Sequence, residues 1–279
     1  MPELPEAEVV ARQLRSTVLG ATLKDCWVGR PDIVRQGLES LEWYRGARVA
    51  AVERTGKSVV LGLDRAGERR YLVAELGMTG LLLFDTMDAP HHKHVHMILG
   101  LEGQPGHPRP SELRYWNPRR FGRIHLLDRV GLEQFCRRRF GCDPLAVTAE
   151  EFARLVKARR GRLKAFFLHQ QRIAGIGNIY ANEILHRARI HPHAHGARLS
   201  RTAIAQLYAA MQTVLNEAIQ AGGSTIRDFM APDGSPGRFQ HQHRVYNKAG
   251  LPCPSGCGRF IRRLVTERSS FYCPSCQRR

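Results

Sequence analysis

The sequence predicts an α+β protein whose N-terminal half is rich in strands and whose C-terminal half is rich in helices. Three observations favour this class. Short apolar runs separated by turn residues extend from Leu23 to about Leu127, which is typical of a β-sandwich. A helical apolar period dominates from Thr148 to about Gln220, and two close pairs of cysteines follow near the C-terminus. The length of 279 residues suits one large domain or two modest ones.

A helix is expected over residues 7–19, where valine and leucine recur at helical spacing. Pro5 suits the first turn of this helix, and Gly20 ends it. The strands of the sandwich are expected within six apolar runs, at residues 49–52, 59–61, 71–73, 81–84, 97–99 and 124–127. The stretch from Gly103 to Pro110 is rich in glycine and proline and is expected to be an exposed loop.

The helical half is expected to begin after a domain junction within Gly131–Leu145. Thr148 and Glu151 form the capping-box pattern that starts a helix. The helical pattern then continues, with interruptions or loops at residues 175–177, 190–192 and 222–237. Residues 245–279 form a small cysteine-bearing unit.

The charge balance indicates a polyanionic partner. The chain has 43 Lys and Arg residues against 25 Asp and Glu residues, a formal net charge of +18. An excess of this size most often serves nucleic-acid binding. No run of about 18 apolar residues is present, so we expect no membrane span. The N-terminus lacks the order of a secretion signal, and we therefore expect a cytoplasmic protein with reduced thiols.

Four cysteines near the C-terminus form two pairs, Cys253 with Cys257 and Cys273 with Cys276. Such pairs, separated by a strand-like segment that could form a hairpin, suit tetrahedral zinc. We therefore expect one structural Zn²⁺ ion, with disulfides or free thiols as the alternative. The remaining cysteines are expected to be plain small side chains: Cys26, Cys136 and Cys142.

The first residues could carry covalent chemistry. Proline at position 2 permits removal of Met1, which would leave a secondary amine able to form a charged iminium with a sugar carbon. Glu3 beside it could move protons. Taken alone, this pattern is weak, because proline and glutamate are also ordinary residues of a first helical turn.

The segment Gly175–Asn178 lies between two predicted helices. Glycines allow backbone N–H groups to approach a phosphate closely, and Asn178 begins a helix whose dipole favours an anion. The simpler interpretation is an inter-helix turn.

Six segments in order resemble the formamidopyrimidine-DNA glycosylase family along nearly the whole chain. They are residues 1–6 (MPELPE), 76–80 (LGMTG), 117–122 (NPRRFG), 174–181 (AGIGNIYA), 222–229 (GGSTIRDF) and 267–276 (ERSSFYCPSC). Each segment alone is moderately specific, and the six in sequence are very specific. The start Leu4–Glu6 favours the purine-directed branch of the family.

The resemblance implies an N-terminal catalytic β-sandwich with flanking helices and a C-terminal helix–two-turn–helix domain with a zinc-finger β-hairpin. The expected boundaries are 1–135 for the catalytic domain, 146–226 for the helix–two-turn–helix domain, 227–244 for a lesion-recognition loop region and 245–279 for the zinc finger. The implied partner is double-stranded DNA that contains oxidised bases or abasic sites, and the protein is expected to be a monomer in the bacterial cytosol.

The implied activity is that of a bifunctional DNA glycosylase and abasic-site lyase in base-excision repair. Pro2 would attack C1′ of a damaged nucleotide and form a Schiff base, and β,δ-elimination would then cut the strand. Glu3 would assist ring opening, Lys57 would hold a phosphate, and Glu6 and Glu183 would support the site. The implied substrates are 8-oxoguanine and formamidopyrimidines.

An enzyme that acts on a base must first extrude it from the stack. Met78, Arg119 and Phe121 match the residues that fill the vacated space, which suits two apolar side chains and a hydrogen-bond donor. The remaining DNA contacts that the resemblance implies are made by His92, His94, Lys164, Asn178 and Arg268.

Several positions depart from the family pattern. Glu75 stands in place of histidine, Asn117 in place of aspartate, and Lys93 and His96 in place of acids. His169 and Asn182 also replace common aspartates. The histidines of His91–His96 could indicate a second metal, but we favour strand residues near DNA.

Three other functions compete with this interpretation. An endonuclease VIII-like glycosylase would keep the chemistry but act on oxidised pyrimidines. A non-catalytic protein that binds damaged DNA or abasic sites would keep the zinc unit but lack the amine, and it gains support if Met1 is retained. A zinc-ribbon transcription factor would explain the C-terminus but not Pro2, Glu3 and Lys57.

Overall fold

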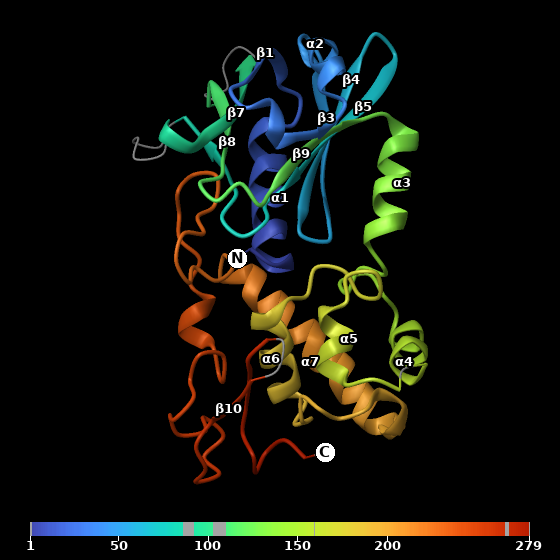
Figure 1. Cartoon of the computed structure of the whole chain (residues 1–279), viewed down its shortest axis with the longest axis vertical. Helices are drawn as coiled ribbons and strands as arrows, with labels where there is room; N and C mark the ends of the chain where they lie inside the picture. The colour runs from blue at the N-terminus through green and yellow to red at the C-terminus, as the bar shows by residue number, and fades with distance from the viewer. Residues whose placement is uncertain (1, 86–91, 103–109, 159, 266–267, 279) are drawn as a thin grey trace. The chain divides into compact units, whose positions relative to one another are not determined.

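The computed structural model describes residues 2–85, 92–102, 110–158, 160–265 and 268–278. The chain divides into two compact units (Figure 1). The N-terminal unit comprises Met1–Arg138 and Ala221–Arg238, and the C-terminal unit comprises Arg139–Gln220 and Phe239–Arg279. The segment after the last long helix therefore returns to the N-terminal unit before the chain enters the cysteine-bearing region.

A nine-stranded sheet forms the framework of the N-terminal unit, and helix α1 (Leu4–Val18) precedes it. The strands are β1 (Thr22–Val28), β2 (Val34–Gln36), β3 (Arg48–Thr55), β4 (Ser58–Arg65), β5 (Glu68–Glu75), β6 (Leu81–Phe84), β7 (Val95–Glu102), β8 (Glu112–Trp116) and β9 (Arg123–Leu127). Their order is β2-β9-β5-β4-β3-β1-β7-β8-β6, and neighbouring strands are antiparallel except for β2 and β9. Short helices lie between some of the strands: η1 (Pro31–Ile33), η2 (Leu38–Ser40), α2 (Leu41–Tyr44) and η3 (His92–His94).

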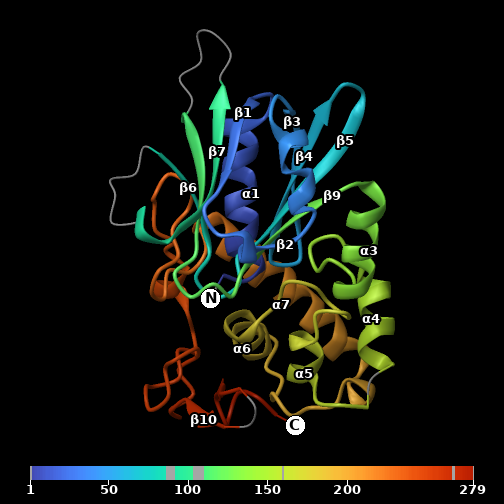
Figure 2. The same ribbon diagram turned by 45° about the horizontal axis from the view of Figure 1, so that its top comes forward.

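The sheet is nearly divided between β3 and β1, where a single pair among the described residues, Thr22 with Arg48, joins the strands. By contrast, β3 and β4 pair from Arg48 opposite Asp64 to Thr55 opposite Ser58. Two halves result, β2-β9-β5-β4-β3 and β1-β7-β8-β6 (Figure 2). Side chains from both halves form one hydrophobic core. The predicted α+β class with an N-terminal β-sandwich is confirmed.

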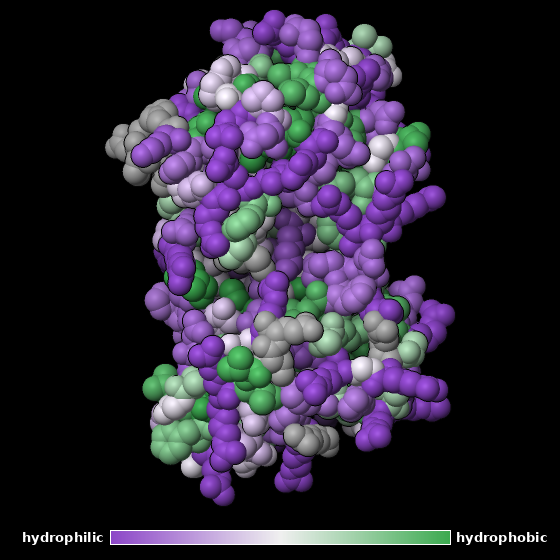
Figure 3. Space-filling model, viewed as in Figure 1, coloured by the Kyte–Doolittle hydropathy of each residue, from purple (hydrophilic) through white to green (hydrophobic). Residues whose placement is uncertain are grey.

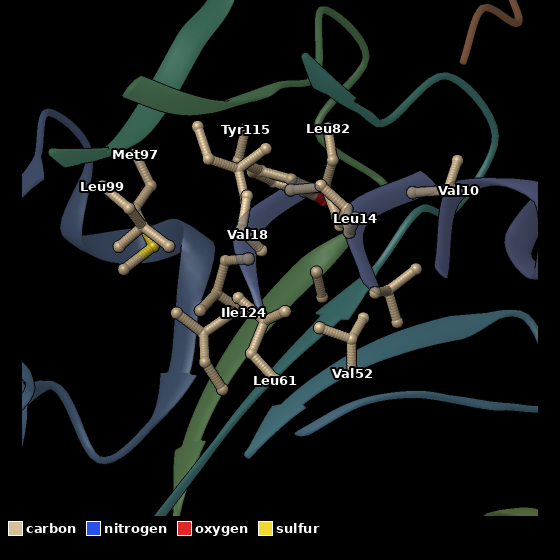
Figure 4. Packing of buried hydrophobic residues seen from close by; sticks show 14 of the residues in the cluster. Val10, Leu14, Val18, Val52, Leu61, Leu82, Met97, Leu99, Tyr115 and Ile124 are labelled. Carbon is tan, nitrogen blue, oxygen red and sulfur yellow. The ribbon is translucent and has the colours of Figure 1, made fainter. Parts of the chain in front are cut away.

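The core of the N-terminal unit packs against α1. The buried face of this helix is at most 1% exposed at Ala7, Val10, Ala11, Leu14 and Val18. Figure 4 shows Leu14 and Val18 among side chains from both sheet halves, which include Val52, Leu61, Ile124, Leu82, Met97 and Tyr115. Strand β4 is buried along Ser58–Leu63, as a continuous apolar run predicts for a strand covered on both faces.

Strands β1, β2 and β8 and helix α3 (Arg129–Arg139) lie outside the predicted apolar runs, as do the short helices η1, η2, α2 and η3. Helix α3 occupies part of the segment expected to be a junction, and Phe135 is its one buried residue. The loop expected at Gly103–Pro110 lies outside the described residues except for Pro110.

The C-terminal unit contains the helices that the apolar period predicts. They are α4 (Ala149–Lys157), α5 (Leu163–Leu168), α6 (Asn178–Arg187) and α7 (Arg201–Gln220), with short helices η4 (Gly196–Arg198) and η5 (Phe239–Gln242). The capping box is confirmed, because the Glu151 amide donates to Thr148 Oγ1 at 3.2 Å and the Thr148 amide donates to Glu151 Oε2 at 3.1 Å.

A small hairpin closes the chain. Strands β10 (Arg262–Leu264) and β11 (Ser270–Tyr272) pair antiparallel, with Arg262 opposite Tyr272.

Hydrophilic side chains cover most of the face seen in Figure 3. Within the described ranges, no helix has the length and apolar character needed to cross a bilayer.

Candidate functional site

The N-terminal turn of α1 is fixed by one carboxylate, that of Glu6. Glu3 caps the helix and is 1% exposed, and its backbone amide donates to Glu6 Oε2 at 2.7 Å. The other carboxylate oxygen, Oε1, accepts a hydrogen bond from the Ser224 amide at 2.7 Å. Gly223 adopts a φ of +80° beside this contact, and a Cβ there would lie 2.9 Å from Glu6 Oε1. Pro2 is buried next to this anchored turn.

Lys57 lies in the tight turn between β3 and β4, next to Gly56, which has a φ of +57°. Arg54 braces this turn, because its Nη1 donates to the Gly56 carbonyl at 3.1 Å. Arg54 Nε also donates to Glu8 Oε2 on α1 at 2.9 Å. The helix that carries Glu3 and the turn that carries Lys57 are thus linked through an ion pair.

Met78, Arg119 and Phe121 lie on two loops, residues 76–80 and 117–122, called here the paired loops. Gly77 has a φ of +61°, and a Cβ on it would overlap the Gly122 backbone nitrogen, so the loops touch through their glycines. The Arg119 guanidinium lies 5.0 Å from the centre of the Phe121 ring. Met78 is 38% exposed and Phe121 is 56% exposed. The structure therefore brings the three predicted residues to one exposed part of the N-terminal unit.

Among the described residues, the one candidate metal group consists of four cysteines, and it includes neither His94 nor His96. His94 is half-buried and makes an edge contact with Trp116. His96 is buried, and its Nε2 lies 2.9 Å from the Asn117 carbonyl, to which it must donate. Burial lowers the pKa of His96, which is consistent with a neutral ring. His91 and the side chain of His92 lie outside the described part of the chain.

Glu75, one of the departures from the family pattern, contacts a buried histidine. Its Oε2 lies 2.8 Å from His125 Nε2, and His125 is 2% exposed. The Glu75 carbonyl accepts a hydrogen bond from the Tyr115 hydroxyl at 2.7 Å. Glu75 thus joins β5 both to β9 and to β8.

In the C-terminal unit, Asn178 is the first residue of α6 and is half-buried. The glycine turn before it is braced by Gln170, whose Oε1 accepts from the Gly175 amide and whose Nε2 donates to the Ile176 carbonyl, both at 2.8 Å. Gly175 has a φ of +86°. This rigid turn leads into a helix N-terminus, where backbone amides favour an anion.

Lys164 and Arg268 differ in their exposure. Lys164 is 5% exposed, and its Nζ donates to the Ser269 carbonyl at 2.7 Å and to Ser270 Oγ at 2.8 Å. Arg268 is exposed and lines a pocket that is also formed by Arg162, Lys164, Ala165, Leu168, His169, Pro192, His193 and Ser270. Lys164 therefore fastens α5 to the segment that carries Arg268.

The four C-terminal cysteines converge. Their Sγ atoms all lie within 4.8 Å of one another, with Cys253 and Cys276 at 3.8 Å and Cys257 and Cys273 at 3.4 Å. Tetrahedral zinc bound to four thiolates would separate sulfur atoms by about 3.8 Å. None of the cysteines is in a disulfide, so this donor set fits a single thiolate-preferring metal ion.

The cysteine-bearing segment is attached to α6 through two buried polar side chains. The Glu183 carboxylate accepts hydrogen bonds from the backbone amides of three successive residues, Arg244, Val245 and Tyr246, at 2.8 to 3.0 Å. Asn182 Oδ1 accepts from the Phe271 amide on β11 at 2.8 Å. Burial raises the pKa of Glu183, and the three amides oppose that shift.

Two family models match most of the chain. The formamidopyrimidine-DNA glycosylase N-terminal domain matches residues 1–124, and the H2TH domain of the same enzymes matches residues 140–230.

The chain belongs to the formamidopyrimidine-DNA glycosylase family. It is therefore an enzyme of the DNA-glycosylase class, and the helix–two-turn–helix region of its predicted fold is confirmed.

Curated and solved members of the formamidopyrimidine-DNA glycosylase family are similar over their full length. The protein of that name from Solibacter usitatus is 39% identical over 100% of both chains. The crystal structure of the Thermus thermophilus enzyme has a TM-score of 0.84 and 38% identity, and covers 99% of this chain and 98% of that one. The Lactococcus lactis enzyme in complex with DNA containing an abasic site has a TM-score of 0.87 and 30% identity, and covers 99% and 100%.

Some residues that support the candidate site are not identified by sequence motifs. Glu8 and Arg54 link α1 to the Lys57 turn, and Tyr115 lies beneath the paired loops. Glu8 and Arg54 are 46 positions apart along the chain, and Tyr115 and its partner Glu75 are 40 positions apart. No local spacing could therefore have found them.

Proposed function

We propose that this enzyme removes oxidised purines from duplex DNA with the amine of Pro2 as nucleophile and then cleaves the strand at the abasic site. The observation that carries the proposal is the Glu6 carboxylate, which holds the amides of Glu3 and Ser224 and so fixes the turn beside Pro2. A nucleophile gains most from such fixed placement.

In the first step, the Pro2 nitrogen, freed by removal of Met1, forms a bond to C1′ of the damaged nucleotide. The bond from C1′ to the base breaks, and the base leaves with the electron pair and takes up a proton. Glu3 protonates the ring oxygen O4′, the sugar opens, and a charged iminium links Pro2 to C1′.

The iminium then acts as an electron sink. Loss of a proton from C2′ expels the 3′ phosphate, and a second elimination expels the 5′ phosphate, after which water releases the sugar remnant from Pro2. Lys57 holds a DNA phosphate during these steps. Its turn is joined to α1 through Arg54 and Glu8, which supports a fixed distance between lysine and nucleophile.

The DNA is held and deformed by different residues in this proposal. Asn178 and Arg268 bind phosphates, with His92 and His94 as further contacts. Lys164 fixes the segment that carries Arg268, because its Nζ donates hydrogen bonds to Ser269 and Ser270. Met78, Arg119 and Phe121 fill the space that the extruded base leaves, and their exposure on the paired loops supports that role.

The four cysteines would hold one Zn²⁺ ion, which stabilises the hairpin that carries Arg268 and takes no part in the chemistry. We assign residues 1–135 to catalysis, 146–226 to the helix–two-turn–helix domain, 227–244 to lesion recognition and 245–279 to the zinc finger. Because the proposed substrate is bacterial DNA, we assign the enzyme to the bacterial cytosol.

Borohydride trapping tests the proposal. The protein is incubated with duplexes that contain 8-oxoguanine, a formamidopyrimidine or an oxidised pyrimidine, and then reduced. We expect a crosslink at residue 2 on both purine lesions, slower trapping with Pro2→Gly, and no trapping when Met1 is retained. A crosslink mapped to a lysine would contradict the nucleophile, and preferential trapping on the pyrimidine would contradict the substrate class.

A further inference from the structure

Asn117 is a fully buried hydrogen-bonding centre in the N-terminal unit, with 0% exposure. Its Oδ1 accepts from Thr79 Oγ1 at 3.2 Å and from the Arg120 amide at 3.1 Å. Thr79 belongs to the loop that carries Met78, and Arg120 belongs to the loop that carries Arg119. One side chain therefore joins both paired loops.

The other end of the side chain begins a directed relay. Asn117 Nδ2 donates to the Tyr115 hydroxyl at 3.0 Å, and that hydroxyl donates to the Glu75 carbonyl at 2.7 Å. Burial raises the pKa of Tyr115, so the hydroxyl keeps its proton. Since a carbonyl oxygen can only accept, the hydroxyl is committed as a donor to Glu75. Its oxygen is therefore left to accept a hydrogen bond, and in this chain Asn117 supplies the donor.

Gly122 lies directly over this relay. A Cβ at Gly122 would overlap the Tyr115 hydroxyl and the Glu75 carbonyl, and would lie 2.7 Å from Asn117 Nδ2. Gly122 in turn touches Gly77 in the other loop. The 117–122 loop thus packs directly on the relay, and the 76–80 loop packs on the 117–122 loop.

The backbone of Asn117 is also held. Its amide donates to the His94 carbonyl at 3.0 Å, and its carbonyl accepts from His96 Nε2 at 2.9 Å. The residue is therefore fixed to the start of β7, and its side chain transmits that position to the loops.

We propose that Asn117 is a positioning residue whose side-chain amide sets the geometry of the paired loops, so that Met78, Arg119 and Phe121 enter the duplex together. This inference rests on the gap-filling role proposed above for those three residues. The family pattern has aspartate at this position together with histidine at position 75, whereas this chain has Asn117 together with Glu75. In this chain an aspartate at position 117 would have nearly the same shape but would offer no donor to Tyr115. The hydroxyl could then donate to the new carboxylate only by leaving the Glu75 carbonyl without its bond.

Asn117→Asp tests the inference, with Thr79→Val as the matched control because it removes one bond to Asn117 and keeps the relay. We expect Asn117→Asp to slow excision of 8-oxoguanine by about tenfold and to leave cleavage at a preformed abasic site within about twofold. Thr79→Val should have the smaller effect. Hydrogen exchange should be faster in Asn117→Asp at residues 76–80 and 117–122, with the thermal midpoint close to that of the wild type.

Double-mutant cycles separate positioning from general weakening. If Asn117 acts through the loops, Asn117→Asp should add little to the excision defect of Arg119→Ala, and Tyr115→Phe should add little to Asn117→Asp. The inference is overturned by unchanged exchange in the paired loops, by equal slowing on lesion and abasic substrates, or by full additivity with Arg119→Ala. Normal excision by Arg119→Ala would instead refute the gap-filling role, and loop exchange would still decide whether the relay positions the loops.

Discussion

Glu8 is a single carboxylate that joins α1 to the turn carrying Lys57. Arg12 Nε and Arg54 Nε donate to its two oxygens at 2.8 and 2.9 Å, and the Arg54 side chain is only 6% exposed. Burial acts to raise the pKa of Glu8, but the hydrogen bonds and charges of the two arginines outweigh it and lower that pKa. The pair therefore stabilises the folded state in a pH-dependent way.

Glu8→Gln should lower the free energy of unfolding of the N-terminal unit by about 1 to 3 kcal/mol at pH 7, because it removes the carboxylate charge that Arg12 and Arg54 share. The folded pKa lies below that of unfolded glutamate, about 4.3. The contribution is therefore complete above that value and disappears as the pH falls through the folded pKa. Urea unfolding of both proteins from pH 7 to pH 3 measures the difference, and a gap that widens on acidification would contradict the assignment.

Lys164 shows what a residue-level motif can and cannot predict. The resemblance implies a DNA contact, which stays a prediction. In the structure the ammonium group donates to Ser269 and Ser270, more than 100 positions away in the sequence. The spacing of cysteines, by contrast, predicts a geometry directly, because four thiolates must converge to hold one ion. Motifs predict residue types, but the direction of a long side chain depends on distant packing.

The capping box of α4 is an element-level feature that the sequence predicts fully. Thr148→Ala should destabilise this helix by about 1 kcal/mol, because the Glu151 amide loses its acceptor. Thr148→Ser keeps the hydroxyl and is the control, with an expected change below about 0.5 kcal/mol. Hydrogen exchange of the α4 amides reports the effect, and equal exchange in both variants would show that the cap does not hold the helix.

The cysteine-bearing hairpin has a hydrophobic core that is too small to keep it folded without a bound metal ion. Its buried cluster consists of Val245, Ile261 and Phe271 together with two of the cysteines, Cys253 and Cys273. Loss of the proposed metal ion would therefore remove four metal–sulfur bonds, two of them made by cysteines of this cluster. The hydrogen bonds that Glu183 and Asn182 accept from this segment would remain, but they fix its backbone and do not replace its core.

Cys273→Ser, or treatment with a zinc chelator, should abolish DNA binding while the N-terminal unit stays folded. The β3, β4 and β5 amides should keep their protection against hydrogen exchange, because the core of that unit contains none of the ligands. Amides of β11 should lose protection. Full DNA affinity of Cys273→Ser, or metal analysis that finds no zinc in the wild type, would refute the proposed centre.

The elements that the sequence predicts are those whose burial is continuous or periodic. Strand β4 is apolar at nearly every position and is buried along most of its length. Strand β1 is mostly exposed or half-buried, with Trp27 51% exposed, so it has no clear alternation. Helix α3 buries only Phe135 and therefore has no apolar face to recognise. These elements depend on contacts with neighbouring strands and turns. A local sequence pattern carries no information about those contacts.

At the scale of the molecule, the proposed function gives the formal charge of +18 two distinguishable purposes. Arginines that bind phosphate add affinity for any duplex and release counterions, so their loss changes the salt dependence of binding. An arginine that enters the duplex after base extrusion acts on damaged DNA alone. In the proposed function Arg268 belongs to the first class and Arg119 to the second, although both are counted equally in the net charge.

Arg268→Ala should weaken binding to lesion-containing, abasic and undamaged duplexes alike, and should reduce the slope of log affinity against log salt by about one. Arg119→Ala should leave that slope unchanged. It should impair excision of 8-oxoguanine and discrimination of the opposite base, and do less harm at a preformed abasic site, because there no base must be extruded. Binding of both variants to the three duplexes at several salt concentrations, with single-turnover excision alongside, makes the comparison. If Arg119→Ala weakens all three equally with a reduced slope, Arg119 is another phosphate contact, and the charge of this protein has a single purpose.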